Sequence, residues 1–337
     1  MQRMKKHIYV YSPSGAVRDK AAFKRGVKRL QALGHEVEVD EAALASFQRF
    51  AGDDETRLAA IHRAAASGAD VAMISRGGYG LTRILPAIQY KRVAKAIERG
   101  TKFVGLSDFT AFQMAVLAKT GALTWAGPSL CEGFGASDTA DSADGHGHAG
   151  NAGADEIMQA CFDDMILGQG EGTGWRQHKA RATDVAQVSA FHARRLSESA
   201  EYALHDAVLW GGNLAVLCSL LGTPYVPQIK GGILFLEDVA EHPYRIERML
   251  TQLLNAGVLA RQKAILLGQF TEYKLVPHDK GFKLQSVINW LRSQLKIPVL
   301  TNLPFGHVAT KVLLPVGAKT DLLVQGRDAL LLWGHAH

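Results

Sequence analysis

The sequence predicts an α/β protein whose first half is a parallel β-sheet with helices on both faces. Apolar segments of strand length alternate with helical segments from residue 7 to residue 120, a pattern typical of parallel sheets covered by helices. Glycines follow two of the helical segments, at Gly34 and Gly121, where helices commonly end. With 337 residues, 47% of them hydrophobic, the chain is long enough for two domains or for one large α/β domain.

The first half divides into strand–helix units. Its strands are expected at residues 7–12, 35–40, 69–80 (which ends in a glycine loop) and 102–107. Its helices are expected at Lys20–Leu33, Thr56–Ser67, Tyr90–Arg99 and Phe109–Thr120. Residues 136–155, which follow, are nearly all small or polar. They bury too little apolar area to offset the entropy of ordering, so we expect a disordered surface insertion there.

The second half has a mixed pattern. A helix at Ala154–Leu167 leads into a glycine-rich, charged stretch, and regular elements resume at residue 208. They are a helix after residues 211–213, strands at 231–238, 264–270 and 297–305, helices at Tyr244–Ala256 and Leu284–Leu295, and β-hairpins over 311–333. We therefore expect an N-terminal domain over residues 1–168, a linker over 169–205 and a C-terminal α/β domain over 206–337.

Composition and charge favour a cytoplasmic enzyme. The net charge is +6, but the densest basic groups, Lys5–Lys6 and the set Lys91, Arg92 and Lys95, lack the interleaved aromatic residues of a nucleic-acid-binding surface. Three widely spaced cysteines without a C-x-x-C motif argue against a disulfide framework. No apolar run reaches the roughly 18 residues of a membrane span, and no signal-peptide core precedes the first strand. We expect no nucleic-acid partner and no membrane contact.

The residues also argue against a metal centre. Two histidines of the insertion, His146 and His148, would need a third ligand, and no rigid element nearby supplies one. The chain has no H-E-x-x-H motif and no compact carboxylate cluster. No metal and no other cofactor are therefore expected.

Ser107 lies between a buried strand and the helix that follows it. A serine at such a tight turn exposes its hydroxyl at the carboxyl edge of the sheet, as in a nucleophile elbow. The N–H of Asp108 then points out of a helix N-terminus, where it can stabilise an oxyanion. The sequence G-x-S-D meets the generic G-x-S-x-G motif only in part, and the alternative is a serine that caps the helix.

The glycine loop at residues 77–80 lets backbone N–H groups approach a ligand closely. It lacks both the dinucleotide fingerprint and the phosphate-loop lysine, so it is either a second oxyanion donor or a plain turn. Further along, Glu237 and Asp238 end an apolar strand, where active sites collect in α/β folds. Asp238 suits a helix cap better than Glu237 does. His307 follows Gly306 in a loop after another apolar strand and is either a base or a structural histidine.

Several motifs carry a family resemblance. They are SRGGYGLTRIL, GLSDFTAF, GPSL, LWGGNLAVLCSLLGTPY, LFLEDVAEHPYRIERMLTQL, RQKAILLGQF and FGHVATKVLLPVGA. In their order along the chain and in their sequence, they closely resemble the muramoyl-tetrapeptide (LD-) carboxypeptidases of the S66 serine peptidase family. The resemblance covers nearly the whole chain outside residues 136–205, and the segment 176–205 is longer than the usual linker of the family.

The resemblance implies a Rossmann-like N-terminal domain, a C-terminal domain with β-barrel-like structure, and a homodimer. It implies removal of the terminal D-alanine from the murein tetrapeptide during cell-wall recycling. Its catalytic residues match Ser107 as nucleophile, His307 as base and Glu237 behind the histidine. The implied oxyanion donors are the N–H groups of Asp108 and Gly78. Substrate contacts are expected from Arg76, Gly77, Tyr79, Gly211, Gly212 and Asn213, with Arg83 as a further candidate for a substrate carboxylate.

Two other functions remain open at this point. A relative in the same family would use the same three residues to hydrolyse a peptide–nucleotide antibiotic. A non-catalytic protein that binds a nucleotide or sugar on the same sheet would not need Ser107, Glu237 and His307 to converge.

Overall fold

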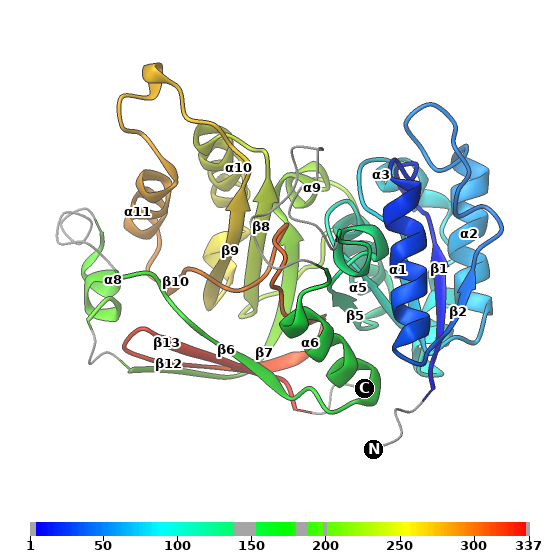
Figure 1. Ribbon diagram of the computed structural model, residues 1–337. Coiled ribbons are helices and arrows are strands. Elements are labelled where there is room, and N and C mark those ends of the chain that lie inside the picture. Colours follow the sequence, from blue (N-terminus) through cyan, green and yellow to red (C-terminus); the bar gives the residue numbers. More distant parts are fainter. Residues whose placement is uncertain (1–4, 138–152, 180–187, 198–200, 335–337) are drawn as a thin grey trace.

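The computed structural model describes residues 5–137, 153–179, 188–197 and 201–334 of the chain. They form two β-sheets that lie side by side, with helices packed around each (Figure 1). Strands from the first half of the chain make most of the first sheet, and strands from the second half make the other. The predicted α/β class is confirmed.

The first sheet has the strand order β11-β5-β4-β3-β1-β2. Its strands are β1 (His7–Tyr11), β2 (Glu36–Val39), β3 (Val71–Ile74), β4 (Lys102–Gly105), β5 (Thr124–Ala126) and β11 (Leu314–Val316). Strands β1 to β4 run parallel, as predicted, and β5 continues the parallel order, whereas β11 pairs antiparallel with β5. Neither β5 nor the pairing of β11 with this sheet was predicted.

Helices cover both faces of the first sheet, as predicted. Along β1, Ile8 and Val10 contribute to the core on one face, and Tyr9 and Tyr11 contribute to the core on the other. The first face is covered by α1 (Lys20–Ala32), the π-helical turn η2 (Leu130–Phe134) and α6 (Glu156–Leu167). The second face is covered by α2 (Asp54–Ala66), α4 (Tyr90–Glu98) and α5 (Phe109–Thr120). The short helices α3 (Leu81–Ile84) and η1 (Leu85–Ala87) follow the glycine loop.

The second sheet has the order β10-β9-β8-β7-β12-β13-β6. Its strands are β6 (Gly172–Arg176), β7 (Glu201–Asn213), β8 (Ile233–Val239), β9 (Ala264–Thr271), β10 (Val299–Leu300), β12 (Lys319–Gln325) and β13 (Asp328–Leu332). The long strand β7 pairs parallel with β8 through its second part and antiparallel with β12 through its first part. The helices of this half are α8 (Ala190–Arg195), α9 (Leu214–Ser219), η3 (Leu259–Arg261), α10 (Pro243–Asn255), η4 (Pro277–Asp279) and α11 (Leu284–Gln294).

The barrel-like structure implied for the C-terminal domain is not seen as a closed barrel within the described residues. Closure would require the two edge strands to pair, and here β10 and β6 stand at opposite edges of the sheet. The predicted strand at 297–305 is also mostly wrong. Only Val299–Leu300 pair with β9, and the chain then turns into the loop that carries His307.

Two strands cross the predicted domain limits. Strand β6 lies inside the predicted linker, yet it pairs with β13 at the edge of the second sheet. Strand β11 lies inside the predicted C-terminal domain, yet it belongs to the first sheet. Most of the predicted insertion, including His146 and His148, lies outside the described residues. At its end, Asp155 accepts a hydrogen bond from the N–H of Met158 and caps α6.

Candidate active site

Ser107 lies on a strained turn between β4 and α5. Its φ is 65°, in the left-handed region that residues other than glycine rarely adopt. Such a conformation costs roughly 1–3 kcal/mol and persists only where the surrounding structure holds it. The turn is closed by the N–H of Thr110, which donates to the carbonyl of Ser107 over 2.9 Å. The serine is half-buried and stands at the carboxyl end of β4, so its backbone has the form of a nucleophile elbow.

Backbone donors surround this turn. Within the described residues, the N–H of Asp108 has no hydrogen-bond acceptor, and it lies at the N-terminus of α5. Gly77 faces the serine directly. A Cβ added to Gly77 would lie 2.7 Å from Cβ and 2.8 Å from Oγ of Ser107. Gly78, with a φ of 112°, lies against Arg76 instead, and its role as an oxyanion donor stays a prediction.

The Asp108 side chain links three turns, a role that the sequence did not reveal. Its carboxylate accepts hydrogen bonds from Oγ of Ser14 over 2.8 Å and from the N–H of Leu81 over 3.0 Å. Burial raises the pKa of this carboxyl group, while these hydrogen bonds lower it by less. The contact holds the glycine loop and the turn after β1 against the Ser107 turn. Ser14, a polar residue in the turn after the first strand, does not by itself predict this contact.

His307 and Glu237 form a partly buried pair. Nδ1 of His307 donates a hydrogen bond to Oε2 of Glu237 over 2.7 Å, and the carboxylate is fully buried. Burial lowers the pKa of the imidazole. The charge of Glu237 and this hydrogen bond raise it by more, so the pKa is about 9. The pair therefore fixes the orientation of the ring, leaves Nε2 as the nitrogen that can accept a proton, and stabilises the imidazolium form.

Asn213 connects this pair to its surroundings. Its Nδ2 donates to Glu237 over 3.2 Å and to Asp238 over 3.0 Å. Asp238 also accepts from the N–H of Ala215 in α9 over 2.9 Å, whereas α10, the helix that it was expected to cap, is capped by His242. Burial, and then the neighbouring charge of Glu237, raise the pKa of Asp238 to about 7. The backbone N–H of Asn213 donates to Oγ1 of Thr110 over 3.0 Å, so the network reaches the Ser107 turn.

Gly211 and Gly212 are buried packing positions. A Cβ on Gly211 would lie 2.0 Å from the carbonyl oxygen of Phe235, and one on Gly212 would lie 2.5 Å from Oγ1 of Thr110. Their φ values are 128° and 141°, which glycine alone adopts without strain. They bring β7 close to β8 and α5. Of the three residues of this motif, Asn213 is the one that contacts the candidate catalytic side chains.

The predicted substrate contacts Arg76, Arg83 and Tyr79 have different surroundings. Arg76 is partly buried against Gly15 and Gly78, and burial lowers its pKa. Arg83 forms an ion pair with Asp54 over 3.1 Å, so its charge already has a partner within the protein. Tyr79 is exposed, with its ring centroid 5.9 Å from that of Phe50.

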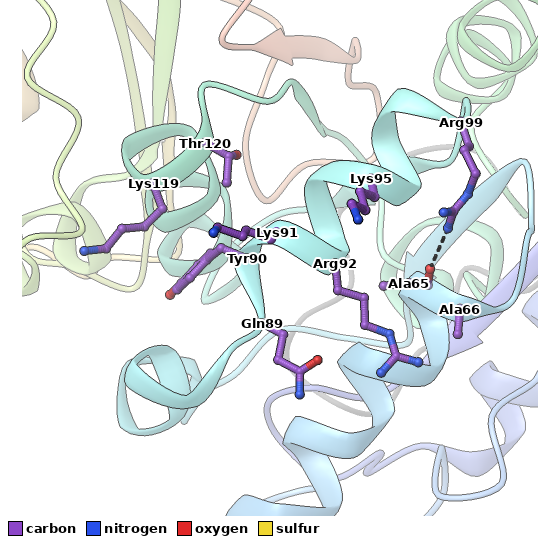
Figure 2. Close-up of a pocket in the computed structure, with 10 residues that line it drawn as sticks. All are labelled: Ala65, Ala66, Gln89, Tyr90, Lys91, Arg92, Lys95, Arg99, Lys119 and Thr120. Carbon is purple, nitrogen blue, oxygen red and sulfur yellow. Dashed lines mark hydrogen bonds between the residues drawn. The ribbon is translucent and has the colours of Figure 1, made fainter.

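A basic groove lies away from Ser107, between α2, α4 and the C-terminal end of α5 (Figure 2). It has a volume of about 900 Å³. Its lining residues are Ala65, Ala66, Gln89, Tyr90, Lys91, Arg92, Lys95, Arg99, Lys119 and Thr120. Basic residues that look scattered in the sequence are thus gathered by the fold, although none of them lies on the Ser107 turn or the His307 loop.

In the part of the chain that the structure describes, no group of three or more His, Cys, Asp or Glu side chains is arranged to hold a metal ion. None of the described helices combines the length and the apolar character that crossing a membrane would require.

Comparisons with known proteins identify the family. Residues 8–127 match the model of the LD-carboxypeptidase N-terminal domain, and residues 206–322 match that of the C-terminal domain. The chain belongs to the LD-carboxypeptidase family, peptidase family S66. A putative carboxypeptidase of Synechocystis sp. is 30% identical over 94% of this chain and 90% of its own length. The prediction from the sequence motifs is therefore confirmed.

Solved structures share the fold of this chain. The crystal structure of muramoyltetrapeptide carboxypeptidase from Oxalobacter formigenes is 36% identical, with a TM-score of 0.77 over 96% of this chain and 97% of that one. The microcin C7 self immunity protein MccF, solved with aspartyl sulfamoyl adenosine, is 20% identical, with a TM-score of 0.79 over 99% and 98%. At that identity, MccF supports the fold alone. The LD-carboxypeptidase fold is thus common to a murein enzyme and to an immunity protein.

Proposed function

We propose that this LD-carboxypeptidase is a serine enzyme that cleaves the bond between meso-diaminopimelate and the terminal D-alanine of the murein tetrapeptide. The main support is the partly buried Glu237–His307 pair, which is linked through Asn213 and Thr110 to the strained turn of Ser107. The name and the 36% identity of the muramoyltetrapeptide carboxypeptidase support this substrate class.

In the first step, Oγ of Ser107 attacks the carbonyl carbon of the diaminopimelate residue while Nε2 of His307 takes its proton. Glu237 keeps the ring oriented and stabilises the imidazolium that forms. The resulting oxyanion accepts hydrogen bonds from the N–H of Asp108 and from a glycine of the 77–80 loop. Each such donor is worth about 3–4 kcal/mol in related acyl transfer.

In the second step, the C–N bond breaks and His307 returns the proton to the departing amine of D-alanine. Water then attacks the ester carbon of the acyl-enzyme and gives a proton to His307. The proton passes to Oγ as the ester C–O bond breaks, so Ser107 is restored and the tripeptide leaves with a new carboxylate.

The test is the Ser107→Ala variant with murein tetrapeptide as substrate. We expect the rate of D-alanine release to fall by at least about 10³-fold. The unfolding midpoint should not change, because only the hydroxyl group is removed and no new contact is made. Release is measured by mass spectrometry. Wild-type activity in the variant would exclude Ser107 as the nucleophile. An aminoacyl sulfamoyl adenosine, assayed in parallel, distinguishes a murein enzyme from an immunity enzyme.

A further inference from the structure

One loop carries both His307 and a buried lysine. The N–H of Val312 donates to the carbonyl of Pro304 over 2.8 Å, which closes residues 304–312 into a compact loop. Lys311, four positions after His307, is only 2% exposed. The charges of these two residues interact, and both also interact with the exposed carboxylate of Glu132. The loop thus carries a buried cation and the imidazole on one closed segment of the chain.

Lys311 has no direct partner for its charge. Among the hydrogen bonds and ion pairs of the described residues, none involves its Nζ, and Glu132, Glu237 and Asp155 act on it only at longer range. Burial accordingly lowers the pKa of the amine more than these carboxylates raise it. A buried ammonium without a hydrogen-bonded anion is costly, so an anion that arrives with the substrate would relieve a cost already present in the free protein.

We propose that Lys311 binds the C-terminal carboxylate of the substrate. This inference rests on the proposed function, in which His307 protonates the departing amide nitrogen of the last residue. In an α-amino acid, the carboxylate carbon is two bonds from that nitrogen, so a cation that binds it must lie close to the imidazole. Lys311 lies on the same closed loop as the imidazole and its charge acts on the ring, so it is the candidate for that contact. Such a contact makes the enzyme a carboxypeptidase, because a peptide that continues beyond the cleaved residue has no carboxylate there.

The competing explanation is structural. Lys311 could serve only to balance the negative charge of Glu237 and Asp238, which lie next to each other in the second sheet. A lysine of that kind would support folding and the His307 pair for every substrate equally. The two explanations therefore differ in whether loss of the charge depends on the terminal group of the substrate.

The test compares murein tetrapeptide with its C-terminal amide in wild-type protein and in Lys311→Met, which keeps the length of the side chain. In wild-type protein we expect kcat/KM to be about 100-fold higher for the free acid than for the amide. In Lys311→Met this preference disappears, through a loss of about 100-fold on the acid and little change on the amide. Lys311→Arg, which keeps the charge, restores part of the preference.

The matched control is Lys319→Met, since Lys319 is an exposed lysine that pairs with Asp206 on the surface. It should keep the wild-type preference. An equal loss on acid and amide in Lys311→Met, or an unchanged preference, would overturn the inference. If the wild-type protein releases no D-alanine at all, the proposed function fails instead, so the two failures are distinguishable. Folding of each variant is checked by its unfolding midpoint.

Discussion

At the scale of single residues, the pKa of the His307 imidazole is set by two opposing effects. Burial acts to lower its pKa, and the adjacent Glu237 carboxylate outweighs that effect, to give a value of about 9. A base works only in its neutral form, so the free enzyme should gain activity as pH rises towards this value. In the proposed mechanism the same carboxylate stabilises the imidazolium of the transition state, so a less basic ring would not be an advantage.

The pH profile of Glu237→Gln tests this assignment. In wild-type protein we expect kcat/KM to rise with pH and to level off above about 9. In the variant the negative charge is gone while burial remains, so the midpoint of the rise moves to much lower pH. Its plateau falls by roughly 10³- to 10⁴-fold, as in other enzymes whose catalytic histidine loses its carboxylate. D-alanine release is measured across the pH range, with Glu98→Gln, an exposed glutamate on α4, as the control. Identical midpoints for wild-type protein and Glu237→Gln would contradict the pairing.

At the scale of elements, the glycine loop and the Ser107 turn fit each other closely. There is no room for a side chain at Gly77. Its φ is not in the left-handed region, so an alanine at this position would cause a steric clash and not backbone strain. The contact is with the nucleophile itself. Substitution should therefore change the chemistry more than the stability.

We expect Gly77→Ala to lower kcat by about 100-fold, because a displacement of about 1 Å at a reacting atom has effects of that size. The free energy of unfolding should fall by only about 1–3 kcal/mol, as for other overpacked sites. Gly174→Ala in β6 is the control, since its Cβ would come no closer than 3.6 Å to any neighbour. Steady-state kinetics and chemical denaturation measure the two effects. A Gly77→Ala enzyme with wild-type kcat would show that this contact does not position Ser107.

Some features of these elements can be predicted from the sequence, whereas contacts between distant turns cannot. Ser107, Glu237 and His307 lie in or after apolar strand segments, a local pattern that marks them as candidates, while their catalytic roles stay a prediction from the family resemblance. Helix α5 was predicted with its observed limits because its apolar run ends at a glycine. The contacts of Asp108 with Ser14 and Leu81 could not be predicted, since they join turns that are far apart in the sequence. Packing of backbone against backbone, as at Gly211, is equally invisible in a single sequence.

At the scale of the whole molecule, the two sheets share one core. Helix α5 is buried along residues 109–116 because it packs against α4 in the first half of the chain and against β7 and α9 in the second. Strand β11 returns from the C-terminal part to pair Leu314 with Ala126. Periodicity indicates a strand at residues 314–316, but it carries no information on a partner so distant in the chain. The limits of the two predicted domains therefore stay a prediction, while the shared core implies that the halves do not unfold independently.

Hydrogen exchange of the native protein tests this cooperativity. If the sheets unfold together, the slowest amides of β3 and of β8 report the same free energy of opening, because only global unfolding exposes them. Leu314→Ala removes a fully buried side chain from the shared core and should lower both values equally, by about 2–5 kcal/mol. Leu330→Ala in β13, whose side chain is 38% exposed, is the control and should lower them by less than about 1 kcal/mol. Peptide-level mass spectrometry separates the two strands. Protection lost in β3 alone would mean that the first sheet opens by itself, and that the two halves are not stabilised as one cooperative unit.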